Sequence, residues 1–167
     1  KSVLAFNLPS VDLVNYEADD LIATYVDQIL KIGAKVTIVS SDKDLMQLFR
    51  KDVRIFDPMK NKFISEEDVQ NKFGVDPTKV IDVQALAGDS SDNVPGVPGI
   101  GVKTAAELIN RYGNLENLLK STNEIKQNKR RETLIENKDK AIISKKLVTL
   151  KHDAPVDRDL TEFKLKE

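Results

Sequence analysis

The chain has 167 residues, of which 40% are hydrophobic and 32% are charged, as expected for one ordinary domain with a substantial core. It contains no cysteine and a single histidine, His152, which excludes disulfides, thiolate sites and histidine-rich metal sites, so any hard-cation site must use Asp and Glu oxygens. No apolar run approaches the ~20 residues that cross a bilayer, so we expect no membrane association, and the cysteine-free, mixed-charge composition suits a reducing cytoplasm. The net charge of −1 by itself indicates no particular partner.

The front half is predicted to alternate strands and helices. Strand–helix–strand spacing of this kind predicts an α/β fold with parallel strand pairing and right-handed crossovers. Gly33 is expected to end the main helix. The predicted elements are a helix tail at 1–7, a strand at 11–14, a helix at 17–32, a strand at 35–39, a helix at 43–50, a strand at 53–56, a turn at 57–61 and a strand at 63–64.

The back half is predicted to be helical. Thr78 is expected to cap the second of its helices, and Pro155 lies in an extended tail. The predicted helices cover 66–73, 78–87, 102–112, 114–120 and 131–150, with a Gly/Pro/Ser/Asp loop at 88–101. We therefore predict an α/β core at 1–87, a helical region at 88–151 and a tail at 152–167.

Two acidic clusters follow predicted strands. The carboxyl ends of parallel strands form the edge where ligands bind in open sheets, and carboxylates are the ligands that Mg²⁺ prefers. Helix capping explains one or two such residues, and a solvated acidic edge remains an alternative to a metal site. The clusters are Glu17, Asp19 and Asp20 after the first strand, and Asp42 and Asp44 after the second.

A third acidic pair, Asp89 and Asp92, leads into a glycine-rich segment, PGVPGIGVKTAA at 95–106. Gly99 and Gly101 flank Ile100 just before a predicted helix, which places backbone N–H groups where an anion can bind. No strand directly precedes this segment and the P-loop spacing is missing, so we predict a hairpin between helices that holds phosphate. The Asp pair taken alone could be no more than a helix cap.

The charge is unevenly distributed along the chain. Residues 1–100 have a net charge of −5 and residues 101–167 have a net charge of +4. A folded dipole explains this, and so does a nucleic-acid-binding back half. Basic residues beyond the hairpin could extend a phosphate track or lie on solvated helix faces, and they are Lys103, Arg111, Lys120, Lys126, Lys129, Arg130 and Arg131.

Three strings carry a family resemblance that runs from about residue 5 to residue 156. YEADD at 16–20, SSDKDLMQL at 40–48 and ALAGDSSDNVPGVPGIGVKTA at 85–105 resemble the 5′-nuclease domains of the flap-endonuclease family, including those of bacterial DNA polymerases. The resemblance implies a PIN-like or resolvase-like parallel-sheet core followed by a helix–hairpin–helix-type element. It also implies two-metal hydrolysis of DNA phosphodiesters with Mg²⁺ or Mn²⁺, with no side-chain nucleophile.

By position, the resemblance assigns metal ligands and a DNA-gripping hairpin. The first metal set is Glu17, Asp19 and Asp20, and the second is Asp42, Asp44, Asp89 and Asp92. The DNA-binding residues are Gly96, Gly99, Ile100, Gly101, Lys103 and Thr104. The family also binds a monovalent cation, often K⁺, at this hairpin, for which the sequence assigns no ligands. The implied partners are nicked, flapped or 5′-ended duplex DNA and a polymerase domain in the same full-length chain.

The family's first strand, its first metal-binding Asp residues and its helical arch are expected to lie outside this chain. The chain then corresponds to the carboxyl-side part of the nuclease domain. Two readings follow besides an active nuclease. One is a non-catalytic DNA-binding fragment, and the other is a carboxylate-based phosphatase for small molecules, which the hairpin and the basic back half disfavour.

Overall fold

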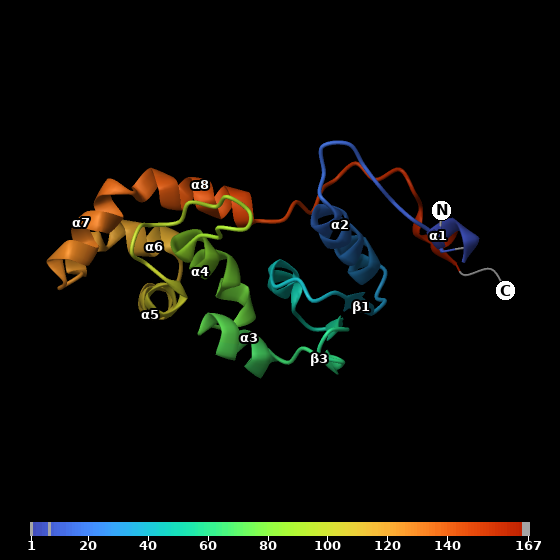
Figure 1. Cartoon of the computed structure of the whole chain (residues 1–167), viewed down its shortest axis with the longest axis horizontal. Helices are drawn as coiled ribbons and strands as arrows, with labels where there is room; N and C mark the ends of the chain where they lie inside the picture. The colour runs from blue at the N-terminus through green and yellow to red at the C-terminus, as the bar shows by residue number, and fades with distance from the viewer. Residues whose placement is uncertain (1, 7, 165–167) are drawn as a thin grey trace. The chain divides into compact units, whose positions relative to one another are not determined.

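The structure is a computed structural model that describes residues 2–6 and 8–164, shown as a ribbon in Figure 1. It divides into two compact units. Unit 1 comprises residues 1–37 and 150–167, and unit 2 comprises residues 38–149. None of the helices in the described ranges is long and apolar enough to span a membrane.

Unit 1 is organised around one amphipathic helix. Its elements are α1 (Ser2–Ala5), α2 (Ala18–Lys31) and the short 3-10 helix η4 (Leu160–Phe163). Helix α2 buries Leu21, Ala23 and Val26 among its apolar residues. The helix ends at Lys31, and Gly33 adopts a positive φ of 75°, a conformation that glycine adopts without strain.

The chain's tail packs along α2 and is held there by specific contacts. The hydroxyl of Thr24 donates to the Lys151 carbonyl at 3.4 Å and accepts from the Ala154 N–H at 3.1 Å. The rings of Tyr25 and Phe163 meet edge to face with 5.1 Å between their centroids. These contacts join residues that lie more than a hundred positions apart in the sequence, so the tail is part of a folded unit.

The predicted strand at 11–14 is wrong. Among the residues that the structure describes, this segment belongs to no sheet, although its side chains favour strands. The Tyr16 N–H donates to the Leu13 carbonyl at 3.2 Å and Asn15 has a positive φ of 69°, so the segment ends in a tight turn. A short β-prone segment needs a partner strand for its backbone groups, and none of the described strands pairs with it.

A small sheet has the strand order β1-β2-β3. The boundary between the two units falls inside β1, and β2 and β3 lie wholly in unit 2. The strands are β1 (Val36–Val39), β2 (Val53–Asp57) and β3 (Lys62–Phe63). Strands β2 and β3 form an antiparallel hairpin in which Phe56 lies opposite Phe63. The predicted α/β fold class is confirmed, and this hairpin adds an antiparallel pair to the sheet.

The rest of unit 2 is helical, and α4 is its centre. Helix α4 buries six of its eight residues and packs most extensively against α8 and α5. The elements are η1 (Asp44–Leu48), α3 (Glu66–Phe73), η2 (Pro77–Lys79), α4 (Val80–Ala87), α5 (Val102–Tyr112), α6 (Leu115–Lys120), η3 (Thr122–Glu124), α7 (Asn128–Glu136) and α8 (Lys138–Val148).

Three helix predictions need correction in detail. The helix expected at 43–50 is the shorter 3-10 helix η1, in which the Met46 N–H donates to the carbonyl of Lys43, three residues back, at 3.0 Å. Asp76, not Thr78, is a capping residue here: its carboxylate accepts from the Thr78 N–H at 2.9 Å at the start of η2, and α4 then follows Lys79 without a side-chain cap. The helix expected at 131–150 starts earlier and breaks at Asn137, whose side-chain amide donates to the Thr133 carbonyl.

Candidate metal centre and nucleic-acid interface

Asp44 opens η1, directly after the turn that leaves β1. The Asp42 N–H donates to the Ser40 hydroxyl at 3.0 Å, and the Asp44 N–H donates to the Asp42 carboxylate at 2.9 Å. The two bonds hold the backbone at the start of η1. Asp42 therefore helps to shape the turn, and one of its oxygens is already bonded to the backbone.

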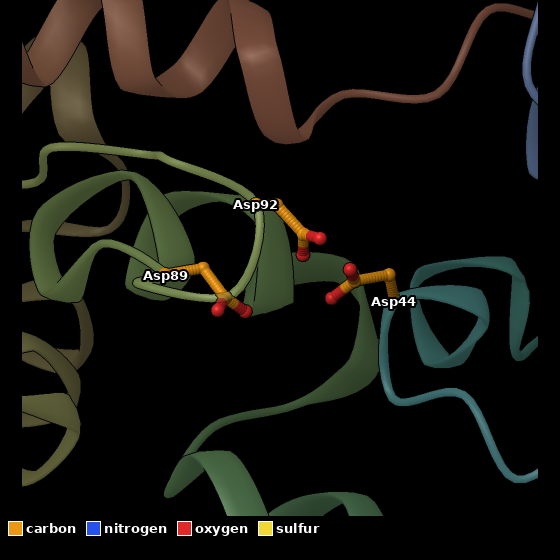
Figure 2. Close-up of side chains that lie close together, drawn as sticks. All are labelled: Asp44, Asp89 and Asp92. Carbon is orange, nitrogen blue, oxygen red and sulfur yellow. The ribbon is translucent and has the colours of Figure 1, made fainter.

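Asp89 and Asp92 lie in a short loop that follows α4. Asp89 and Val94 exchange both backbone hydrogen bonds, at 2.9 and 2.8 Å, which closes the loop at its base. The Ser91 N–H donates to the Asp89 carboxylate at 2.9 Å, and Asn93 makes the turn with a positive φ of 54°. The sequence string DSSDN therefore forms a closed turn that brings both carboxylates to one side of the loop (Figure 2).

The carboxylates of Asp44, Asp89 and Asp92 converge. One oxygen of each lies within 4.8 Å of the others. Figure 2 shows the three side chains approaching from η1 and from the loop after α4. Asp44 and Asp89 are half-buried and Asp92 is exposed. We call these three residues the aspartate cluster.

The electrostatics of the aspartate cluster suit a divalent cation. Burial raises the pKa of Asp44, the charges of Asp42 and Asp89 raise it further, and a hydrogen bond from Gln84 opposes the rise. The ammonium of Lys43 lowers the pKa of Asp89 through a direct ion pair. Three close carboxylates around one point repel one another when ionised, and a bound cation relieves that repulsion. Their oxygen-only donor set is the kind that Mg²⁺ or Mn²⁺ takes, so the residues fit such an ion.

Three of the other predicted metal ligands, Glu17, Asp19 and Asp20, lie in unit 1. Asp20 is buried, and its carboxylate accepts from the Lys151 N–H at 2.8 Å and from the Glu17 N–H at 3.4 Å. Glu17 and Asp20 form a capping box at the start of α2, which is the helix-capping alternative left open by the sequence. Asp19 lies in the first turn of the same helix. A metal-binding role for these three residues, together with Asp42, stays a prediction.

The predicted DNA-binding hairpin contains two residues that hold the loop itself. The Gly96 N–H donates to the buried Ser144 hydroxyl at 2.9 Å, and a Cβ at Gly96 would lie 2.5 Å from the Gly88 nitrogen. Ile100 is 5% exposed, and its N–H donates to the Val97 carbonyl at 3.0 Å. Both residues therefore use their N–H groups inside the protein, and their role in DNA binding stays a prediction.

The open part of the hairpin is formed by Gly99, Gly101, Lys103 and Thr104. Gly99 has a positive φ of 75° with open space where a Cβ would be, and Gly101 is the N-cap of α5. Lys103 and Thr104 lie in the first turn of α5, where backbone N–H groups have no partner within the helix. This arrangement can bind a phosphate through backbone amides and one ammonium.

A groove beside the hairpin adds positive charge that comes from α7. The basic residues of this groove, Lys129 and Arg130, were predicted from the sequence as part of a possible phosphate track. Nothing in the sequence indicated a role for Gln127 and Thr133. The residues that line the groove are Pro98, Gly99, Ile100, Gln127, Lys129, Arg130 and Thr133. We call this the hairpin groove.

Two further residues of the site region were missed by sequence reasoning. Ser144 on α8 is fully buried and accepts the hydrogen bond from Gly96, but its neighbours in the sequence, which are Ile and Lys residues, gave no indication of this role. Gln84 is 4% exposed and donates to the Asp44 carboxylate at 2.5 Å. The signal for Gln84 was present, because it is an uncharged polar residue inside the otherwise apolar stretch VQALA that leads into the aspartate loop.

Comparison with known proteins identifies the family. The 5′-3′ exonuclease N-terminal resolvase-like domain matches residues 1–74, and the 5′-3′ exonuclease C-terminal SAM fold matches residues 75–167. A DNA polymerase I of Rhizobium leguminosarum is 57% identical over 93% of this chain, and a 5′-3′ exonuclease of Buchnera aphidicola is 39% identical over 96% of it. The chain spans 15% of the first relative and 58% of the second.

Solved structures agree with this assignment. The T5 5′-exonuclease with bound zinc superposes with a TM-score of 0.80 at 26% identity, covering 88% of this chain and 55% of that protein. The fold, the domain matches and the sequence relatives point the same way, and they confirm the resemblance carried by the three sequence strings. The chain belongs to the 5′-3′ exonuclease family.

Proposed function

We propose that the chain is the larger part of a nuclease that hydrolyses DNA phosphodiesters at 5′ ends, nicks or flaps, within a bacterial DNA polymerase I that acts in replication and repair in the cytoplasm. The convergence of Asp44, Asp89 and Asp92 is the observation that carries this proposal. The family match supports it, and so do the sequence relatives named DNA polymerase I and 5′-3′ exonuclease.

In this proposal the aspartate cluster holds Mg²⁺ or Mn²⁺ as part of a two-metal site. Such ions lower the pKa of a bound water and stabilise charge on the leaving oxygen, which is the chemistry that phosphodiester hydrolysis requires. Asp89 and Asp92 would contribute oxygens from the closed loop, and Asp44 would contribute one from η1. Glu17, Asp19, Asp20 and Asp42 are proposed as further ligands of the complete enzyme.

The start of α5 and the hairpin groove would together hold the DNA backbone. Lys103 and the first-turn amides of α5 can bind one phosphate, and Lys129 and Arg130 can bind its neighbours. Such contacts neutralise phosphates without reading bases, so binding should depend strongly on salt and little on sequence. A K⁺ ion at the hairpin belongs to the proposal as well.

A second candidate function is DNA binding without cleavage. The Asp20 carboxylate accepts two backbone N–H groups, which favours a structural role for a residue expected to bind metal. The chain also spans only part of its relatives, so the ligand set of the complete enzyme can include residues that lie elsewhere.

One assay separates these functions. The chain and an N-terminally extended version are incubated with a 5′-flap or nicked duplex and Mg²⁺. Cleavage by this chain that disappears in Asp89→Ala supports the nuclease and excludes the binding-only function. Binding without cleavage, with cleavage restored by the extension, shows that the chain alone is not the active enzyme. If neither version binds DNA, the proposed function is wrong.

A further inference from the structure

We propose that Gln84 is a positioning residue for the aspartate cluster, which holds the Asp44 carboxylate in the orientation that a metal ion needs. The inference rests on the proposed function only in taking Asp44 as a ligand. Gln84 donates its side-chain N–H to the Asp44 carboxylate at 2.5 Å, between residues forty positions apart in the sequence.

The surroundings of Gln84 argue against a role in packing alone. It is 4% exposed on α4, and its neighbours Val83, Ala85 and Leu86 are fully buried. A buried amide is unfavourable unless its hydrogen-bonding groups are satisfied. The side-chain carbonyl of Gln84 is buried and has no hydrogen-bond partner among the residues that the structure describes. An apolar residue would fill this position without that penalty.

In this proposal the side-chain NH₂ group of Gln84, and not its carbonyl oxygen, positions the Asp44 carboxylate. The reverse orientation would place the amide oxygen against the Asp44 carboxylate, where two acceptors repel each other, so the hydrogen-bond network fixes the assignment. With this bond, one oxygen of Asp44 is held by α4. Ligating carboxylates are commonly oriented by a hydrogen bond of this kind, and removal of the donor weakens metal binding.

The position of Gln84 in the chain extends its effect beyond Asp44. It lies on the last full turn of α4, which leads directly into the loop of Asp89 and Asp92. Its bond to Asp44 therefore ties η1 to the helix that presents the other two carboxylates. The bond thus joins the two separate segments from which the three ligands come.

The test measures Mn²⁺ affinity by calorimetry on the 167-residue chain. Gln84→Met removes the donor and keeps the length and apolar character of the side chain. We expect Mn²⁺ to bind about tenfold more weakly, with a change in Tm below about 4 °C in the absence of metal. The matched control is Gln47→Met, which removes an amide bond to the Val148 carbonyl at 3.0 Å and should leave Mn²⁺ affinity unchanged.

A double-mutant cycle separates positioning from a general structural effect. If Gln84 acts through Asp44, then Gln84→Met should change Mn²⁺ affinity by less than about twofold once Asp44→Asn is present. Additive losses, or an unchanged affinity in Gln84→Met alone, would overturn the proposal. If Gln84→Met does not fold, Gln84→Asn, whose amide is one methylene too short to reach Asp44, carries the same expectations. If Asp44→Asn itself leaves Mn²⁺ affinity unchanged, the proposed function fails at this site rather than the role of Gln84 alone.

Discussion

The ammonium group of Lys43 forms an ion pair with the carboxylate of Asp89, which is one of the three residues of the aspartate cluster. The side chain of Asp89 is 9% exposed and that of Lys43 is 33% exposed. The hydrogen bond to Asp89 raises the pKa of Lys43, so the pair is charged at neutral pH. Lys43 therefore supplies positive charge where a metal ion would also supply it.

The first prediction is that the Lys43 ammonium and a metal ion compete for the charge of Asp89. Lys43→Met should lower the free energy of unfolding of the metal-free chain by about 1 kcal/mol, because Asp89 loses its counter-charge while Asp44 and Asp92 stay close. Added Mg²⁺ should then raise the Tm of Lys43→Met more than it raises that of the unmodified chain. Thermal unfolding with and without Mg²⁺ measures both effects.

The control for that experiment is Lys62→Met. Lys62 also forms an ion pair, with Asp68 at 2.6 Å, but neither residue belongs to the aspartate cluster. Its substitution should leave the Mg²⁺-dependent rise in Tm unchanged. An equal Mg²⁺ response in Lys43→Met and the unmodified chain would contradict the competition.

A second prediction concerns the acid stability of the fold at Asp68. The Lys62 ammonium, together with the N–H and hydroxyl groups of Ser65, lowers the pKa of Asp68 from 3.8 to about 2. Because the folded-state pKa is depressed, the stabilisation is present above the unfolded value of 3.8 and is lost as the pH falls towards about 2. Asp68→Asn should be less stable than the parent at pH 6, and the difference should shrink on acidification. Urea unfolding across this range checks it, and a difference independent of pH would refute the assignment.

The third prediction compares two glycines of the hairpin. Gly96→Ala should destabilise the chain by more than about 2 kcal/mol, since its Cβ would lie 2.5 Å from the Gly88 nitrogen and 2.7 Å from the Ala87 carbonyl carbon. Gly99→Ala meets nothing within 4 Å and should lose only about 1 kcal/mol, from its positive φ of 75°. Urea denaturation of both variants gives the comparison, and similar losses would show that Gly96 is not closely packed.

A fourth prediction concerns the hairpin groove and duplex binding. Arg130→Ala should weaken binding to duplexes of unrelated sequence by similar factors and reduce the slope of log affinity against log salt by about 1, as expected for one lost phosphate contact. Fluorescence anisotropy over a salt series measures both quantities. Lys140→Ala, an exposed lysine of α8 that does not line the groove, is the control and should change neither. A loss confined to one sequence would point to base contacts instead.

Local sequence patterns marked the residues of the aspartate cluster as two separate groups, and the family resemblance joined them, together with Asp42, into one set. Asp44 follows a short apolar strand, and Asp89 and Asp92 lie in the segment GDSSDN, whose residue types favour a turn. The strand predicted at 11–14 was wrong because, among the described residues, no strand pairs with this β-prone segment. The single helix predicted at 131–150 was wrong because the helix ends at Asn137, whose side chain bonds to the backbone, although the apolar pattern continues past it. Gln84 and Ser144 were missed because their roles depend on partners forty and forty-eight positions away.

The tail that packs along α2 has a consequence for the order of folding during synthesis. The Thr24 hydroxyl accepts from the Ala154 N–H, so unit 1 cannot complete its packing until residue 154 has left the ribosome. Unit 2 is one continuous segment, residues 38–149, so each of its pairings spans fewer positions than the bond between Ala154 and Thr24, and shorter separations close at a smaller entropic cost. The aspartate cluster can therefore form before the tail packs along α2. A chain truncated before residue 150 should keep the aspartate cluster and lose the ordered packing of α2.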